Sequence, residues 1–224
     1  MATPTAPADR PSVDSGPGTP STRGTRSRAG NAMGRTHEAA LRGAVAAIEK
    51  YGSRKATMGD IAMLAGIAKA TLYNHFRTRD DVYLAVAANE VDKVAAAARA
   101  KLPEGFDVAV DEAARLIGEH AAVRKIAVDD PTALAALAAP GDGPAWTAAR
   151  TEIAGALSDR GYVDSPAAVD LVLRYLASQL LTPSSVEGRT GTATLLTDAV
   201  AAQPPRLPES AAEQALADSA DTSS

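Results

Sequence analysis

The chain of 224 residues contains no cysteine, which excludes disulfides, thiolate metal sites and cysteine nucleophiles together. Histidine is nearly as scarce. His37, His75 and His120 are far apart and have no carboxylates at metal-ligand spacing, so we expect no metal site and no cofactor. No apolar run approaches the length of a membrane span, and the N-terminus has no hydrophobic signal core. We therefore expect a cytoplasmic protein that does not enter a membrane.

The net charge of −4 conceals an uneven distribution. Residues 1–80 carry 12 Lys or Arg against 6 Asp or Glu, a net charge of +6, whereas residues 81–224 carry 11 against 21, a net charge of −10. A basic front on an acidic body is typical of a protein whose first part binds a polyanion. The alternative is that the charges merely scatter over a solvated surface. A motif inside the basic part makes this alternative weaker.

The stretch from Thr57 to Phe76 has the pattern of two short helices around a tight turn. Thr57 and Asp60 have the spacing of a capping box that begins a helix, and Gly66 stands where a left-handed residue would end it. In the second helix, Leu72 and Phe76 are four residues apart and can point inward together. The outer face is then polar and aromatic, as in a helix-turn-helix that reads a DNA major groove.

The motifs of this stretch resemble the DNA-binding signature of the TetR-family transcriptional regulators. The matching runs are Asp60-Ile61-Ala62, Ala65-Gly66-Ile67 and Thr71-Leu72-Tyr73-Asn74-His75-Phe76, and the likeness extends over roughly residues 35–84. The resemblance implies an all-α chain, with an N-terminal three-helix helix-turn-helix DNA-binding head followed by a helical ligand-binding and dimerisation domain. It also implies double-stranded DNA as a partner.

Carried over position by position, the resemblance implies DNA-binding roles for individual residues. Those facing base edges or nearby phosphates are Lys69, Ala70, Thr71 and Tyr73, those contacting phosphate are Asn74, His75 and Arg79, and Thr57 caps the supporting helix beside the DNA backbone. Lysine can donate to guanine, methyl groups can meet the thymine methyl, and tyrosine and histidine can donate to phosphate oxygens. Two departures stand out. Ala68 occupies a position where serine is common, which removes an N-cap worth about 1 kcal/mol, and Ala70 replaces a frequent glycine.

Composition and helix signals divide the chain into four segments. We expect a disordered basic arm at 1–33, a DNA-binding domain at 34–84 with its helix-turn-helix at 57–76, an effector-binding and dimerisation domain at 85–202, and a disordered tail at 203–224. The arm has a basic run at Arg23, Arg26 and Arg28 that Arg35 continues. This run either tracks DNA phosphates or belongs to a solubilising tail. Further helices are predicted at 35–51, 80–101, 107–127, 131–139, 145–160, 166–182 and 189–202.

The resemblance also implies a pocket for a small effector between the head and the dimerisation helices. The candidate lining residues are Phe106, Leu116, His120, Trp146, Arg150 and Tyr162. Trp146 and Arg150 are four residues apart and share a helix face, which would suit an anionic or aromatic ligand. The alternative is that the aromatic residues are ordinary core and Arg150 is ordinary surface.

The helix expected at 166–182 is apolar nearly all round, so it should be buried on all sides. We expect one side to meet the core of its own domain and another to meet a second subunit. The resemblance implies that this helix and the last one form a four-helix bundle with their copies in a homodimer. The candidate interface residues are Val172, Leu176, Leu180, Leu195 and Val200.

These observations predict a sequence-specific DNA-binding regulator, and we favour a repressor that a small-molecule effector releases from a palindromic operator. A regulator without a small effector is one alternative. An all-α enzyme or carrier that retains the helix-turn-helix as scaffold is another. The sequence shows no nucleophile–base or metal constellation, so we do not expect an enzyme.

Overall fold

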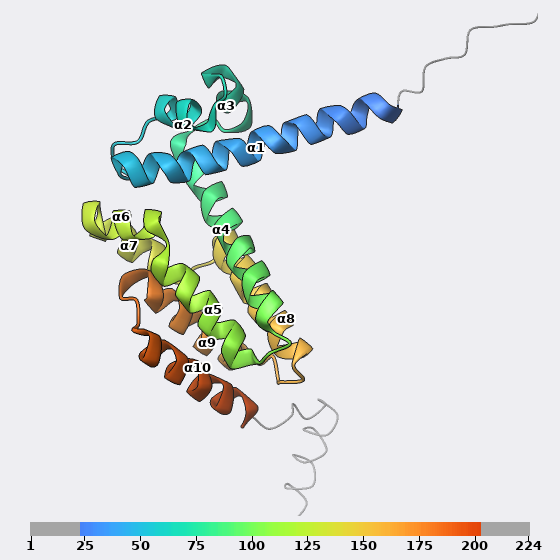
Figure 1. The fold of residues 1–224 in the computed structure, drawn as a ribbon, viewed down its shortest axis with the longest axis vertical. Coiled ribbons are helices and arrows are strands. Elements are labelled where there is room, and N and C mark those ends of the chain that lie inside the picture. Colours follow the sequence, from blue (N-terminus) through green and yellow to red (C-terminus); the bar gives the residue numbers. More distant parts are fainter. Residues whose placement is uncertain (1–22, 203–224) are drawn as a thin grey trace, which may run out of the picture. The chain divides into compact units, whose positions relative to one another are not determined.

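The computed structural model describes residues 23–202, and within this range it contains ten helices and no strand. The helices are α1 (Arg23–Tyr51), α2 (Met58–Ala65), α3 (Lys69–His75), α4 (Arg79–Lys101), α5 (Phe106–Glu119), α6 (Ala121–Asp129), α7 (Pro131–Ala138), α8 (Pro144–Asp159), α9 (Pro166–Leu181) and α10 (Val186–Ala201) (Figure 1). The predicted all-α class is therefore correct. No helix of this range is long and apolar enough to cross a membrane.

The first helix begins earlier than the sequence pattern predicts. α1 starts at Arg23, so the expectation of a disordered arm over 1–33 is wrong for the residues from Arg23 onward. Between Pro20 and Tyr51 the sequence has no proline to stop a helix, and each residue added to an existing helix gains a hydrogen bond without a new nucleation cost. Among the described residues, those up to Arg35 form one unit and those from Thr36 onward form a second. The expected tail at 203–224 and the first part of the arm lie outside the described residues.

The head of the second unit consists of α1 from Thr36, α2, α3 and the start of α4. Its buried core contains Ala40, Leu41, Ala44, Ala47, Ala56, Met58, Ile61, Ala62, Leu72, Phe76, Val82 and Val86. Gly43 is where α1 approaches α2 most tightly: a Cβ atom there would lie 2.6 Å from Ala65 Cβ and 2.7 Å from the Ile61 carbonyl oxygen. Only glycine allows this approach, because the backbone of α2 leaves no room for a methyl group.

The local signals that delimit the helices are confirmed. Thr57 with Asp60 and Thr78 with Asp81 form the two predicted capping boxes. Gly66 has φ of 66° and ends α2 in the left-handed region. Ser165 caps α9, and Asp130 caps α7 before a proline in the first turn.

The body consists of the rest of α4 and α5–α10, packed around a second core. Its members come from four helices and the connection after α4: Leu102, Phe106, Ala109, Val110, Ile153, Leu157, Ala168, Val169, Val172, Leu173, Ala193, Leu196 and Val200. The segment predicted as one helix over 107–127 is two helices, because the backbone of His120 is extended, with ψ of 111°. Gly118 before it favours a helix weakly, and Pro183 packs where a larger residue would stand.

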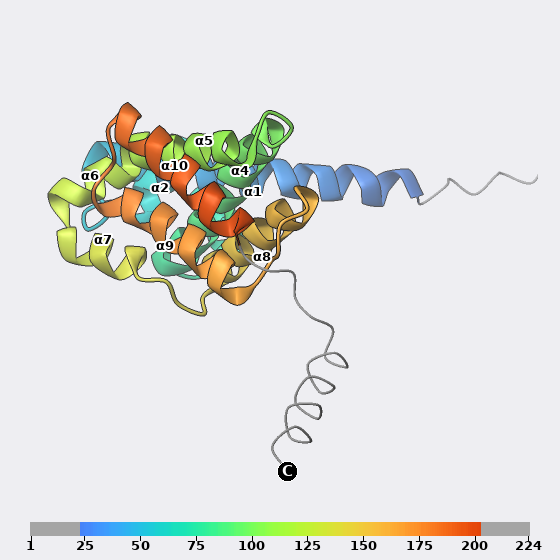
Figure 2. The same cartoon turned by 90° about the horizontal axis from the view of Figure 1, so that it is seen from below.

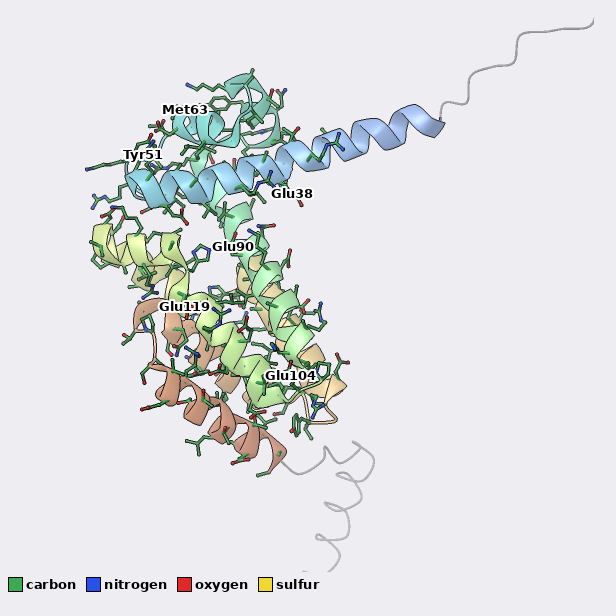
Figure 3. The ribbon with its side chains drawn as sticks, viewed as in Figure 1. Glu38, Tyr51, Met63, Glu90, Glu104 and Glu119 are labelled. Atoms are coloured by element: carbon green, nitrogen blue, oxygen red, sulfur yellow. The ribbon has the colours of Figure 1, made fainter. Side chains whose placement is uncertain are left out.

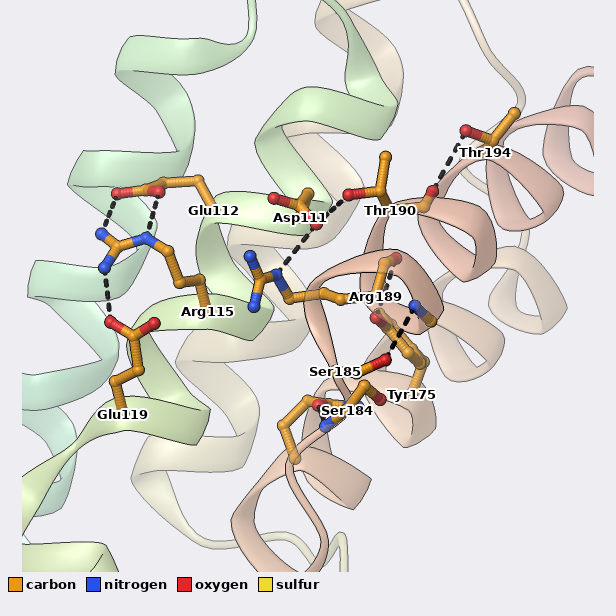
Figure 4. A network of polar contacts seen from close by, with 12 residues as sticks. Asp111, Glu112, Arg115, Glu119, Tyr175, Ser184, Ser185, Arg189, Thr190 and Thr194 are labelled. Carbon is orange, nitrogen blue, oxygen red and sulfur yellow. Dashed lines mark hydrogen bonds and ion pairs between the residues drawn. The ribbon is translucent and has the colours of Figure 1, made fainter.

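A polar network fastens the last helix to α5 (Figure 4). Arg189 Nε donates to Asp111 Oδ1 over 2.9 Å, and Thr190 Oγ1 lies 3.1 Å from the same oxygen. Tyr175 on α9 donates to the carbonyl oxygen of Arg189 over 3.3 Å. Because Arg189 is buried, its pairing with Asp111 fixes the position of α10 and avoids the cost of an unpaired buried charge. The two views in Figures 1 and 2 agree that α10 lies beside α5 and α9.

Candidate DNA-binding surface and effector cavity

The recognition helix α3 is held by its inward residues and leaves the others to solvent. Leu72 is fully buried in the head core. Lys69, Ala70, Tyr73 and Asn74 are exposed, as their predicted roles require, whereas Thr71 and His75 are half-buried. At the start of α3, the backbone of Ala68 has an extended N-cap conformation, and no side chain accepts a hydrogen bond from the first turn.

Two of the exposed residues of α3 form a pair. Lys69 Nζ lies 5.9 Å from the centre of the Tyr73 ring, a distance at which a cation is weakly attracted to the ring face. Tyr73 is 46% exposed. The pair therefore places a cation and a phenol hydroxyl on one face of α3, where both can donate to DNA.

The predicted phosphate ligand His75 is part of an aromatic cluster. Its ring centre lies 5.9 Å from that of His37 on α1, and the His37 ring lies 5.1 Å from the ring of the buried Phe76. Part of the His75 side chain is thus used to pack α3 against α1. The sequence suggests no such role for His37, because a contact between α1 and the end of α3 depends on the tertiary fold.

Arg79 makes its hydrogen bonds within the head. Its Nη1 donates to the carbonyl oxygens of Arg54, over 3.1 Å, and of Ala56, over 3.3 Å. The guanidinium carbon also lies 5.5 Å from the centre of the Tyr83 ring. We therefore regard Arg79 as a residue that holds the α1–α2 connection. Its neighbour Arg77 is exposed in the α3–α4 connection, and no motif of the sequence singles it out.

The remaining predicted DNA contacts are Arg35 and Thr57. Arg35 is exposed on α1. Thr57 is exposed as well, but its hydroxyl donates to Asp60 Oδ2 over 2.6 Å and accepts from the Asp60 N–H over 3.2 Å. The Thr57 hydroxyl and the Thr57 N–H, which lies 2.9 Å from Asp60 Oδ2, both donate to this carboxylate and lower its pKa. Lys55, also exposed in the α1–α2 connection, is a further cation on this side of the head.

A cavity of about 590 Å³ runs through the body and reaches the head. Its walls come from α4–α9 and the end of α1, and alanine and valine predominate among them. The side of α4 is continuous along the cavity: the lining residues are Tyr83, Val86, Ala87, Glu90, Val91, Val94, Ala95, Ala98, Arg99 and Leu102. The size and the apolar walls are those of a small-molecule site.

The principal polar group inside the cavity is Glu90, which α4 presents beside α5 (Figure 3). Its Oε2 lies 3.2 Å from His120 Nε2, and its Oε1 accepts from Lys93 Nζ over 2.7 Å. Burial alone would raise the pKa of Glu90. The hydrogen bonds from His120 and Lys93 outweigh burial and lower its pKa to about 2. The carboxylate is therefore ionised and fully partnered.

Three of the six predicted pocket residues line the cavity, namely Phe106, His120 and Trp146. Leu116 does not. Arg150 does not either, because its Nη1 donates to the Gly141 carbonyl oxygen over 2.8 Å and so braces the connection before α8. Tyr162 also lies outside the lining and packs edge-on against Phe106, with ring centres 5.7 Å apart.

The α4 side of the cavity is absent from the predicted pocket, although the sequence contains a signal for it. Val86, Glu90, Val94 and Ala98 recur every four residues, which places them in a single stripe. A lone carboxylate in such a stripe must find partners when the stripe is buried. That pattern is enough to single out Glu90 as a polar group of a buried wall.

The predicted interface residues of α9 face inward. Val172, Leu176 and Leu180 line the cavity, and Val200 on α10 is buried in its own body core. Residues four and eight apart share one helix face, and here that face is needed to close the domain. Leu195 is the member of the set that is exposed, at 69%.

Other apolar residues of these two helices do reach the surface. Leu171 and Leu181 on α9 are 41% and 49% exposed, and Val186 on α10 is 67% exposed. No group of three or more potential metal-ligating side chains occurs in the part of the chain that is described.

The head and the fold as a whole both have known counterparts. Residues 40–86 match the family model of the bacterial regulatory proteins of the tetR family. A search of curated proteins finds no significant match to the sequence. The fold is similar to the TetR-family repressor AlkX from Dietzia sp., implicated in the biodegradation of n-alkanes, with 20% identity, coverage of 73% of this chain and 94% of that one, and a TM-score of 0.60.

Two further solved structures share the fold. The fatty acid degradation regulator FadR from Bacillus halodurans is 16% identical, with coverage of 76% and 97% and a TM-score of 0.53. The TetR-family repressor QsdR from R. erythropolis is 18% identical, with coverage of 76% and 98% and a TM-score of 0.51. Regulators of this family bind DNA and are not enzymes. Residues 40–86 are therefore a DNA-binding domain of the tetR family, and the chain as a whole has the all-helical fold of solved TetR-family regulators.

Proposed function

We propose that the protein is a homodimeric repressor that binds an inverted-repeat operator and leaves it when a small molecule fills the cavity. The observation that carries this proposal is the double role of α4. Val82 and Val86 at its start are buried in the head core, and its later turns line the cavity as far as Leu102. One rigid element thus contacts both sites, which is what coupling between a ligand and DNA requires.

The cavity also reaches the connection between α1 and α2 directly. Ser53 and Tyr83 both line it, and the Tyr83 hydroxyl donates to the Ser53 carbonyl oxygen over 3.0 Å. The same connection meets the end of α6, where Arg54 Nε lies 3.8 Å from Asp130 Oδ2. A ligand that moves α4 or α6 therefore changes the support of the head.

The DNA contacts follow from exposure on α3. Lys69 and Tyr73 are the candidates for base edges, with Ala70 and Thr71 offering methyl groups to thymine. Asn74, His75 and Arg77 are the candidates for phosphates, because amide, imidazole and guanidinium groups all donate to phosphate oxygens. Each head reads one half-site, so two heads related by a two-fold axis need an inverted repeat.

The dimer face in this proposal differs from the one predicted from the sequence. We assign it to the exposed leucines of α9 and α10, namely Leu171, Leu181 and Leu195. Scattered exposed leucines are normal on a monomer. Here they belong to two adjacent helices, and specific operator binding needs a second head.

The choice of repressor over activator draws on the relatives: AlkX and QsdR, which share this fold, are both described as repressors. A regulator without a small effector is the second candidate. The cavity of about 590 Å³ speaks against it, because protein interiors otherwise contain few voids larger than a water molecule.

The test is selection of bound DNA from a random pool by the purified protein, followed by retardation assays on the enriched duplex. An inverted repeat should be enriched, and its two halves should be needed together for tight binding. Lys69→Ala should cost roughly 1–3 kcal/mol and relax the preference at one base position. His75→Ala should weaken specific and random duplexes alike. Enrichment of a single unrepeated site would rule out operator binding by two heads of a dimer.

A further inference from the structure

We propose that the ligand of this cavity is an uncharged, linear hydrocarbon chain with a small neutral polar head, such as a long-chain alcohol. The inference deepens the proposed function and rests on it, since it names the chemical class of the effector. It follows from three properties of the cavity: its shape, the pairing of its charges, and the position of its unused hydrogen-bonding atoms.

The shape favours a chain over a fused ring. The lining residues of α4 run from Tyr83 to Leu102, and at a rise of 1.5 Å per residue this side of the cavity is about 28 Å long. A compact cavity of about 590 Å³ would be only about 10 Å across, so a cavity that follows about 28 Å of α4 is elongated. An elongated apolar cavity suits a linear hydrocarbon chain better than a compact fused ring.

Among the described residues, the cavity walls contain no unpaired cation that could bind an anionic head group of a ligand. Within the lining, Arg99 is paired with Glu152, and His120 is engaged by Glu90. Lys93, just behind Glu90, already binds that carboxylate. A ligand carboxylate would meet the ionised Glu90 with no partner of its own, which makes its burial costly.

A ligand with a permanently cationic head group is also disfavoured. Both oxygens of Glu90 already accept hydrogen bonds, from His120 and from Lys93. The remaining lining carboxylate outside these pairs is that of Asp159, which is exposed at the end of α8. The interior therefore favours a ligand that carries no charge.

Unused polar atoms mark the place of the head group. Ser53 Oγ and His120 Nδ1 are buried and lack a hydrogen-bond partner within the described chain, and both residues line the cavity. A ligand hydroxyl group can donate to the imidazole nitrogen or accept from the serine. The polar end of the ligand then lies toward the DNA-binding head. Its hydrocarbon chain extends along α4 toward Phe106 and Trp146.

The protein contains an intrinsic fluorescent probe for the test. Trp146 is the single tryptophan of the protein and lines the cavity, so its fluorescence reports occupation without any DNA present. The full-length protein is titrated with hexanol, octanol and decanol, and with decanoate and decyltrimethylammonium, all below their micelle-forming concentrations. Each added methylene of the alcohols should tighten binding roughly fourfold. Decanoate and decyltrimethylammonium should bind at least about tenfold more weakly than decanol.

Adjacent alanines of α4 provide a matched pair of variants. Ala95 lines the cavity, whereas Ala96 is exposed and does not. Ala95→Phe should abolish the fluorescence response to decanol, and Ala96→Phe should keep it. If Ala95→Phe fails to fold, as circular dichroism would reveal, the smaller Ala95→Leu should shift the preference from decanol to octanol.

The outcomes separate the ligand class from the proposed function. Decanoate, decyltrimethylammonium or a rigid polycyclic probe binding as tightly as decanol would overturn the inference, as would an unchanged response in Ala95→Phe. Decanol that occupies the cavity but leaves the operator complex intact in a retardation assay would overturn effector release and leave the ligand class standing. Decanol that binds and releases the operator supports both.

Discussion

The guanidinium of Arg79, at the start of α4, donates to the carbonyl oxygen of Ala56, just before α2. The same Nη1 lies 3.1 Å from the Arg54 carbonyl oxygen, so one nitrogen holds two carbonyl groups of the connection between α1 and α2. A cation in the first turn of a helix opposes the helix dipole. Here its hydrogen bonds to the two carbonyl groups offset that local cost.

Replacement of Arg79 should therefore act on stability. Arg79→Ala leaves two carbonyl groups without a donor and should lower the free energy of unfolding by about 1–2 kcal/mol, measured by urea denaturation. The slope of log affinity for operator against log salt should change little. Arg77→Ala, the control, should leave stability unchanged and reduce that slope by about 0.9. If Arg79→Ala reduced the salt slope and left stability unchanged, Arg79 would be a DNA contact.

The Glu90 carboxylate predicts an acid-sensitive body. Its pKa is lowered to about 2 from an ordinary 4.5, so its contribution is complete above about pH 4.5 and is lost as the pH falls toward 2. For a half-buried group the loss should be of the order of 2 kcal/mol. Glu90→Gln should flatten the dependence of stability on pH in this range, whereas the exposed Glu49→Gln should not. Parallel curves for wild type and Glu90→Gln would contradict the pairing with His120 and Lys93.

The uncapped start of α3 can be repaired. Ala68 has φ of −65° and ψ of 143°, a conformation in which a serine hydroxyl can accept from the first turn of the helix. Ala68→Ser should stabilise the protein by about 1 kcal/mol, a rise in Tm of about 2–4 °C for a chain of this size. Ala70→Ser places the same hydroxyl inside α3, where it cannot cap, and should bring no gain. Calorimetry on both variants is sufficient to decide.

The inward and outward leucines of α9 and α10 should respond differently to a charge. Leu181→Glu with Leu195→Glu places carboxylates on the exposed face and should give a folded monomer by sedimentation. Leu176→Glu with Leu180→Glu places unpaired carboxylates in the cavity wall and should unfold the body or lower its Tm sharply. If the variant with Leu181→Glu and Leu195→Glu remained a folded dimer, the dimer interface would not include these two leucines.

The features that the sequence predicts well are those with a local physical cause. The capping box at Thr57, the left-handed Gly66 and the buried Leu72 each depend on residues within a few positions, and the structure confirms all three. The same holds for the start of α9, where Ser165 precedes a proline. Local hydrogen bonding and helix periodicity carry this information without the rest of the fold.

The features that the sequence does not resolve concern the direction in which a buried face points. Apolar residues all round α9 predict burial on every side, yet they do not say whether Leu176 faces a cavity or a partner. Arg150 shares a helix face with Trp146, but its reach to the Gly141 carbonyl oxygen takes it out of the cavity. His37 beside His75 likewise depends on how α1 crosses α3. Such relations arise from long-range packing, which periodicity does not encode.

Gly43 has a consequence for how a signal can arrive at DNA. With no space for even a methyl group between α1 and α2 at this point, these helices cannot slide or tilt against each other without a steric clash. α1 and α2 therefore move as one body. In the proposed mechanism, a ligand that moves α4 would rotate these two helices together, and the change would appear as an altered spacing between the two recognition helices of the dimer.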